Sequence, residues 1–240
     1  EWVSGLEGRP FFALINFMDA HAPYGRPESR PDLRLWDRPR SPAQNEELAG
    51  AYARCIRELD TGVGALLDNL ATRDWWSQTL VIVVADHGEV ISDASFDHGN
   101  DLIMEEIHVP LIARLPGKIP AGLRIDTPVS ANDIAATIEE LTMTGQRIFP
   151  GRSLRRFMTS DAGPDAADAS VMSELEFVGK PDLLRSIVVG DFHYIRNMET
   201  GAERLFKYRE DPDEKRDLAT LPENRPDLER MRAALATHPL

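Results

Sequence analysis

Apolar runs alternate with amphipathic stretches along the first two thirds of the chain. Residues 80–85 are continuously apolar and 11–18 are apolar except for Asn16, which is typical of strands that are buried on both faces. Between them, apolar residues recur at steps of three and four over 44–70, which predicts a long helix with one face on a core. A strand candidate at 109–113 and a helix candidate at 131–141 follow. This alternation predicts an α/β fold with a mostly parallel sheet flanked by helices.

The last third of the chain has a different pattern. Three short strand candidates are separated by turn residues, which is typical of a small antiparallel sheet, and they span 186–189, 192–195 and 204–206. The stretch 161–169 is small and polar, and 226–237 is expected to form a closing helix. We therefore expect an α/β body over 1–157 and a small antiparallel α+β subdomain over 158–240.

Composition restricts the possible partners. The 27 Lys and Arg against 40 Asp and Glu give a net charge of -13, which repels nucleic acid, so we expect no nucleic-acid partner. An anionic ester would need local cations at its site. The single cysteine, Cys55, excludes an internal disulfide framework and leaves the cellular compartment open. No apolar run approaches the roughly 20 residues that span a bilayer, so we expect no transmembrane segment.

An acidic and an imidazole side chain directly follow the strand candidate at 80–85. Asp86-His87-Gly88-Glu89 stands where the carboxyl end of a parallel strand opens into a ligand crevice. Asp86 offers a hard oxygen ligand and His87 a nitrogen ligand, the donors of a metal site. The alternative is a turn that ends the strand, with Asp86 capping the next segment.

Two further histidines have comparable positions. His21 follows the apolar run 11–18, and His98 lies about a dozen residues after Asp86, close enough to fold back over the same strand end. For His98 a purely structural role is the alternative. His108 and His193 are interpreted as structural, and Glu89 is left unassigned.

The order of these segments resembles the sulfatase branch of the alkaline phosphatase-like superfamily. Asp19–Tyr24 is similar to the family's Asp-Pro-His-x-Pro-Tyr, with Ala20 in place of Pro, and Asp86–Gly88 matches its Asp-His-Gly turn. Residues 98–105 are similar to its His-Gly-x-Ser-Leu-Tyr-x-Glu segment. Further similarity extends over the helix candidate at 129–141, over 150–154, and over the Leu205-Phe206, Asp211–Glu214 and Asp217-Leu218 segments.

The resemblance implies roles for four residues. Asp86 and His87 would be metal ligands, His21 would contact the transferred group or protonate the leaving oxygen, and His98 would take a place often held by Lys. It also implies one divalent cation, Ca²⁺ by family likeness, while the imidazole nitrogen of His87 leaves Mn²⁺ or Zn²⁺ open.

The family's nucleophile is missing from the sequence. It lies in a Cys-x-Pro-Ser-Arg or Ser-x-Pro-Ser-Arg segment whose first residue becomes formylglycine, and Cys55, followed by Ile56-Arg57-Glu58-Leu59, does not match. The chain also starts at Glu1 without Met, so we expect the true start elsewhere. Residues 1–157 would then be the carboxyl-terminal part of the catalytic domain. Its partner would be the missing amino-terminal half of the same protein, and the isolated chain would be inactive.

Three functions remain open. The first is hydrolysis of a small-molecule or saccharide sulfate ester; the second is a phosphodiester or phosphonate monoester hydrolase or phospho-headgroup transferase of the same superfamily. The third, from a different class, is a degenerate sulfatase-like binding protein without catalysis. The sequence indicates neither the substrate alcohol nor the oligomeric state.

Overall fold

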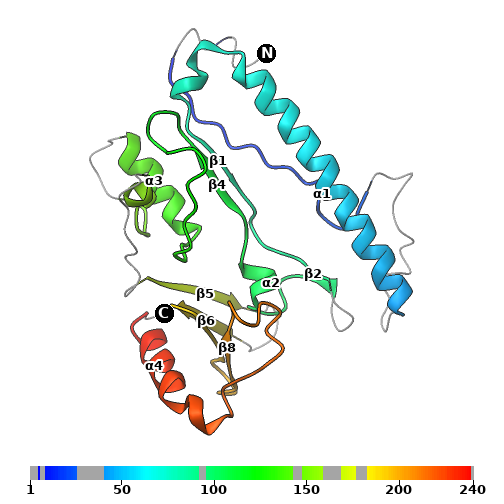
Figure 1. Cartoon of the computed structure of the whole chain (residues 1–240), viewed down its shortest axis with the longest axis vertical. Helices are drawn as coiled ribbons and strands as arrows, with labels where there is room; N and C mark the ends of the chain where they lie inside the picture. Colours follow the sequence, from blue (N-terminus) through cyan, green and yellow to red (C-terminus); the bar gives the residue numbers. More distant parts are fainter. Residues whose placement is uncertain are drawn as a thin grey trace. The chain divides into compact units, whose positions relative to one another are not determined.

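The fold is that of a computed structural model of the whole chain (Figure 1). The residues that the structure describes are Gly5 and the ranges 9–25, 41–91, 96–142, 148–158, 169–176 and 183–238. The chain divides into two compact units. The first comprises Glu1–Leu80 with Val90–Asp97, and the second comprises Val81–Glu89 with His98–Leu240.

The first unit is built around helix α1, Pro42–Ala71, which confirms the helix predicted over 44–70. Ser41 caps its start: the hydroxyl accepts a hydrogen bond from the Gln44 backbone, and the Gln44 side chain accepts one from the Ser41 backbone. The other elements of this unit are the short helix η3, Asp74–Gln78, and the antiparallel pair β2, Val90–Ile91, and β3, Phe96–Asp97.

The apolar run 11–18 differs from the prediction of a buried strand. Residues 11–18 form no strand, and the large side chains after the half-buried Phe11 are exposed, Phe12 by 71% and Leu14 by 86%. A strand forms only where a neighbour satisfies its backbone N–H and C=O groups, and this segment forms no ladder within the described ranges. Its composition is that of a buried strand, but the chain itself does not bury it.

The second unit begins with β1, Val81–Val84, which pairs antiparallel with β4, Leu111–Arg114. The predicted strands at 80–85 and 109–113 are thereby confirmed. Every strand pairing in the described part of the chain is antiparallel, which differs from the expected parallel pairing. Parallel pairing of β1 needs another strand reached by a crossover connection, and 11–18 is not a strand. Ile112 on β4 is 62% exposed.

Helix α3, Asn132–Thr142, confirms the helix predicted over 131–141 and holds the 150–154 segment through buried polar groups. The Asp133 carboxylate accepts from the Arg152 backbone at 2.7 Å, and the Thr137 hydroxyl accepts from the Leu154 backbone at 2.7 Å. Gly151 has φ +106, and an added Cβ would lie 2.6 Å from a carbonyl oxygen of Asn132. This family-like motif is therefore structural. The short helix η4, Leu154–Phe157, follows it.

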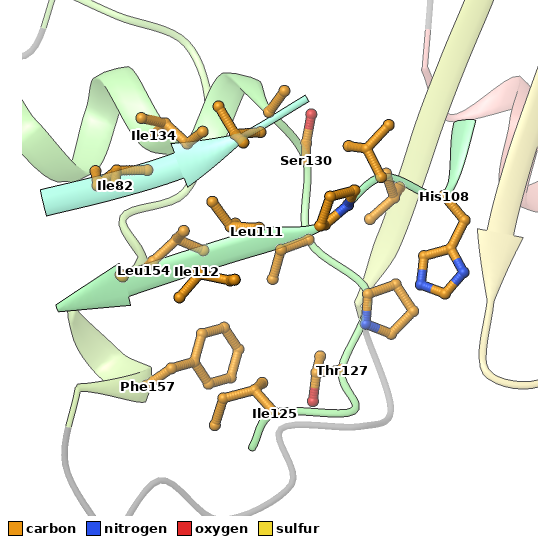
Figure 2. Close-up of a pocket in the computed structure, with 18 of the residues that line it drawn as sticks. Ile82, His108, Leu111, Ile112, Ile125, Thr127, Ser130, Ile134, Leu154 and Phe157 are labelled. Carbon is orange, nitrogen blue, oxygen red and sulfur yellow. The ribbon is translucent and has the colours of Figure 1, made fainter. Parts of the chain in front are cut away.

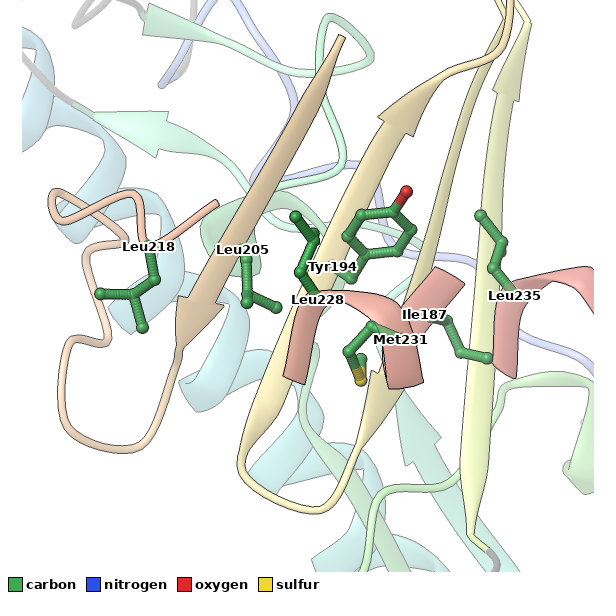
Figure 3. Close-up of a cluster of buried hydrophobic side chains, with 7 residues drawn as sticks. All are labelled: Ile187, Tyr194, Leu205, Leu218, Leu228, Met231 and Leu235. Carbon is green, nitrogen blue, oxygen red and sulfur yellow. The ribbon is translucent and has the colours of Figure 1, made fainter. Parts of the chain in front are cut away.

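Four antiparallel strands form the C-terminal sheet in the order β5-β6-β7-β8. This confirms the predicted antiparallel sheet and its three predicted strands, while β5 was not predicted. Their bounds are Ser170–Glu176, Leu183–Val189, Phe192–Asn197 and Glu203–Lys207. After the short helix η5, Pro222–Asn224, the predicted closing helix α4, Arg225–Ala236, packs on this sheet. Figure 3 shows the buried cluster between them, made of Ile187, Tyr194, Leu205, Leu218, Leu228, Met231 and Leu235.

Glu203 links the sheet to α4 and makes stability depend on pH. The hydrogen bond from Arg232, together with one from the Tyr194 hydroxyl, holds the pKa of Glu203 below its ordinary 4.5. A carboxyl whose pKa is lower in the folded state stabilises the fold above its unfolded pKa, and this contribution is lost as pH falls through the folded pKa. We expect Glu203→Gln to lower the unfolding free energy by about 1 kcal/mol at neutral pH.

Thermal unfolding of the full-length protein at neutral and acidic pH measures this difference, which should shrink below pH 4.5. Glu229→Gln is the control, because Glu229 pairs with Arg225 in an exposed pair on α4. If the stability difference between Glu203→Gln and the parent stayed the same at acidic pH, the lowered pKa of Glu203 would not be its cause.

Candidate functional site

The turn Asp86–Glu89 follows β1 directly and rests on the short helix α2, Met104–Ile107. The Gly88 amide donates to the Glu106 carbonyl at 2.7 Å. An added Cβ at Gly88 would lie 1.9 Å from the Glu105 carbonyl oxygen, so only glycine fits against α2. This close approach fixes the position of the two residues that precede Gly88.

His87 and Asp86 present one nitrogen and one oxygen donor close together. Nδ1 of His87 lies 2.7 Å from the Gly88 carbonyl oxygen. Because a carbonyl only accepts, Nδ1 carries the hydrogen, and the neutral ring keeps its lone pair on Nε2. This Nε2 is 3.9 Å from Oδ1 of Asp86, whose side chain is 88% exposed. The pair therefore has the tautomer and the open position that a metal site needs.

These two donors fit a divalent cation only as part of a larger set. A divalent cation takes at least four ligands. Within the described ranges no cluster of three or more His, Cys, Asp or Glu is arranged to hold a metal ion. The donor chemistry of the pair suits Mn²⁺ or Zn²⁺ through nitrogen and Ca²⁺ through oxygen, and further ligands must come from outside these residues.

His98 lies against this pair. The rings of His87 and His98 stack with centroids 4.0 Å apart and planes inclined by 24°. Nδ1 of His98 is 3.2 Å from a carboxylate oxygen of Glu89, whose side chain is only 6% exposed. A carboxylate accepts, so this contact places a hydrogen on Nδ1 of His98. Glu89, which the sequence left unassigned, therefore orients His98; its position next to Gly88 in the turn was the available signal.

The segment that carries His98 is held by a buried carboxylate. Glu106 on α2 accepts from the Gly99 amide at 2.8 Å and from the Asp101 amide at 3.5 Å. Burial raises the pKa of Glu106, and these backbone hydrogen bonds oppose that rise. The same residue therefore binds Gly88 through its carbonyl and the His98 segment through its side chain.

His21 belongs to the first unit. It is exposed, and its Nδ1 lies 2.6 Å from the Ala22 carbonyl oxygen. Tyr24, fully buried, anchors this segment on α1 beside Leu48 and Cys55, whose thiol has a pKa raised by burial. The structure thus brings together Asp86, His87 and His98, while the convergence of His21 with them stays a prediction.

An open depression in the second unit borders the histidines. Asp86, His87 and His98 line it together with side chains of β1, β4 and the segments after them. Figure 2 shows its apolar side, where Ile112, Ile125 and Phe157 lie near one another. His108, interpreted as structural from the sequence, also lines this depression. Mostly apolar walls with a few convergent polar groups are typical of ligand sites.

Comparison with known proteins identifies the family. The family model described as Sulfatase matches residues 1–144, more than half of the chain. The chain belongs to the sulfatase family. Steryl-sulfatase of Rattus norvegicus is 27% identical over 162 residues, which cover 60% of this chain and 26% of that protein. The Ulvan-active sulfatase of Formosa agariphila is 25% identical over 232 residues, 89% of this chain and 45% of that protein. The sulfatase chain thus spans less than half the length of these relatives.

Solved structures agree with this sulfatase assignment. A phosphonate monoester hydrolase from Silicibacter pomeroyi has a TM-score of 0.73 and 25% identity, over 86% of this chain and 43% of that one. A 2-O GAG sulfatase has a TM-score of 0.71 and 22% identity, over 82% and 44%. The family resemblance seen in the sequence is confirmed, and the fold is a partial alkaline phosphatase-like α/β fold.

Two general properties accompany the assignment. The sulfatase family is generally metal-dependent, which agrees with the donor pair Asp86 and His87. In the described ranges, no helix is both long and apolar enough to cross a membrane.

Proposed function

We propose that the full-length protein hydrolyses sulfate esters with the help of a divalent cation, and that this chain supplies part of the active site. The observation that carries the proposal is the group formed by Asp86, His87 and His98 at the end of β1. A sulfuryl transfer builds charge on peripheral oxygens, and a cation with neighbouring imidazoles offsets that charge.

The family resemblance implies a role for each residue of the group and for His21. Asp86 and His87 would hold the cation, Ca²⁺ by family likeness and Mn²⁺ or Zn²⁺ by the nitrogen donor. The cation would polarise the ester oxygens. His98, oriented by Glu89 through Nδ1, would contact the transferred group in the place often held by Lys. His21 would contact that group or protonate the leaving oxygen.

The rest of the site would come from the missing amino-terminal half of the protein. That half is expected to carry the formylglycine nucleophile and the remaining metal ligands. The exposed apolar side chains of segment 11–18 and of Ile112 support this, because burial by further strands would remove that surface from water. In this proposal 1–157 completes the catalytic domain and 158–240 is the small subdomain.

Phosphonate or phosphate ester hydrolysis is the second candidate. It is favoured by the likeness to the Silicibacter pomeroyi phosphonate monoester hydrolase. The relatives are named for steryl, ulvan and GAG substrates, so the alcohol part of the ester differs between them and is left open here.

Turnover by the full-length protein tests the proposal. We expect hydrolysis of an aryl sulfate to exceed that of the matching aryl phosphate and phosphonate ester, and an isolated 1–240 chain to show none because it lacks the nucleophile. Product release is followed by absorbance with added Ca²⁺, Mn²⁺ or Zn²⁺. Preference for the phosphonate would favour the second candidate. Robust sulfatase turnover by the isolated chain would refute the assignment of a missing nucleophile.

A further inference from the structure

Helix α2 connects the candidate site to the C-terminal sheet within the second unit. Its Glu106 holds Gly88 and Gly99, as described above, and so fixes the two loops whose histidines stack. At its other end, the Met104 amide donates to Oε2 of Glu214 at 3.0 Å. Glu214 lies 110 positions later in the sequence, in the segment after β8. Figure 1 shows α2 beside the C-terminal sheet.

Glu214 is a buried carboxylate that joins two partners. Its side chain is 1% exposed, and Oε1 lies 2.6 Å from Nδ1 of His193, a fully buried residue on β7. Glu214 also has φ +51, a left-handed conformation that residues other than glycine rarely adopt. Buried carboxylates need hydrogen bonds to offset their loss of water, and here one oxygen bonds the C-terminal sheet and the other bonds α2.

Neighbouring contacts also attach the segment after His98 to the C-terminal sheet. Arg204 on β8 binds Asp101 through two hydrogen bonds, at 2.8 and 2.5 Å. Leu102 is buried in a cluster with Leu184, Ile195 and Phe206 of the C-terminal sheet. The sheet therefore holds the segment between His98 and α2 at residues 101 and 102. On α2 itself, Ile107 packs against this cluster, and the Met104 amide bonds Glu214.

We propose that Glu214 is a positioning residue for the sulfatase site: it fixes α2 to the C-terminal sheet and thereby keeps the His87 and His98 loops in their relative positions. A pair that served the sheet alone would need only the contact with His193. The second oxygen instead bonds the helix that holds both loops. The effect on turnover rests on the proposed function, while the effect on α2 does not.

Two amide substitutions of different length separate the effect of the two hydrogen bonds of Glu214 from the effect of its charge. In Glu214→Gln the carbonyl can accept from Met104, and the NH₂ can donate to His193 if that ring moves its hydrogen to Nε2. This nitrogen has no hydrogen-bond partner among the described residues, so the tautomer change breaks no bond recorded there. Glu214→Asn is equally neutral and tolerates positive φ, but it is one carbon too short to reach both partners. Glu214→Gln should therefore keep the hydrogen bonds to Met104 and His193, which Glu214→Asn cannot make together.

Tyr194→Phe is the matched stability control. Tyr194 neighbours His193 on β7, and its hydroxyl donates to Glu203 rather than to α2. The variant removes a hydrogen bond from the same strand without touching the site. A loss of turnover that follows stability alone would appear in this control as well.

The test measures two quantities in the full-length protein: amide hydrogen exchange over 98–107, and kcat and KM for an aryl sulfate. For Glu214→Asn we expect exchange there to rise about tenfold or more and kcat to fall about 10- to 100-fold with little change in KM. Glu214→Gln and Tyr194→Phe should remain near the parent in both quantities.

Unchanged exchange in Glu214→Asn would overturn the inference, whatever the activity. Raised exchange with unchanged kcat would overturn the positioning role. An equal loss of kcat in Tyr194→Phe would also overturn it, because lost stability alone would then explain the lower turnover. Absence of turnover in the unsubstituted protein would refute the proposed function and the positioning role with it. The exchange comparison would still decide whether Glu214 holds α2.

Discussion

Replacing Asp86 with alanine is expected to lower sulfate ester turnover by the full-length protein about a thousandfold or more, because a metal centre contributes several kcal/mol to transition-state stabilisation. Asp86 supplies the oxygen donor next to Nε2 of His87, and one nitrogen from this chain would remain after its removal. Metal content by elemental analysis should fall together with kcat. The exposed position of Asp86 predicts little change in unfolding temperature.

Asp227→Ala is the control for Asp86. Asp227 is an aspartate on α4 that pairs with Arg230, and its loss should leave metal content and turnover unchanged. Activity that survives Asp86→Ala would refute the metal assignment. A full-length protein that binds metal through Asp86 but turns over neither sulfates, phosphates nor phosphonates would instead favour the degenerate binding protein.

Local signals predicted the regular elements well. The spacing of apolar residues was sufficient to predict α1, because helix formation depends on nearby positions. Alternating short runs and turns likewise indicated the C-terminal sheet, whose strands are neighbours in sequence. The Asp86–Gly88 turn was found because it directly follows the strand at 80–85.

Long-range partners could not be predicted in this way. Segment 11–18 has the composition of a buried strand, yet composition does not say whether a neighbour is present to pair with it. Glu214 and Met104 are far apart in sequence, so no periodicity links them. Glu89 lies nine positions before His98, and a loop of that length leaves the pairing open. These contacts depend on tertiary packing, which a single sequence does not encode in a readable spacing.

Gly88→Ala is expected to damage both the fold and the site. The added Cβ would meet the Glu105 carbonyl oxygen at 1.9 Å, and both the obstacle and Gly88 belong to the backbone, so neither can move aside as a side chain could. Either α2 or the Asp86–Glu89 turn must shift, and the hydrogen bond from Gly88 to Glu106 would be lost. We expect the unfolding free energy to fall by about 2 to 3 kcal/mol.

Turnover should fall further than stability explains. A displacement of about 1 Å at reacting groups can cost roughly a hundredfold in rate, and the shift here acts directly on His87. Gly62→Ala is the control, because Gly62 lies on α1 with nothing within 4 Å of the added Cβ, so the change should stabilise the helix by about 0.5 to 1 kcal/mol. Unfolding temperature and kcat are measured for both variants. If Gly88→Ala keeps the parent's kcat and unfolding temperature, the turn does not rest on α2 as described, and the site built from Asp86, His87 and His98 loses its support.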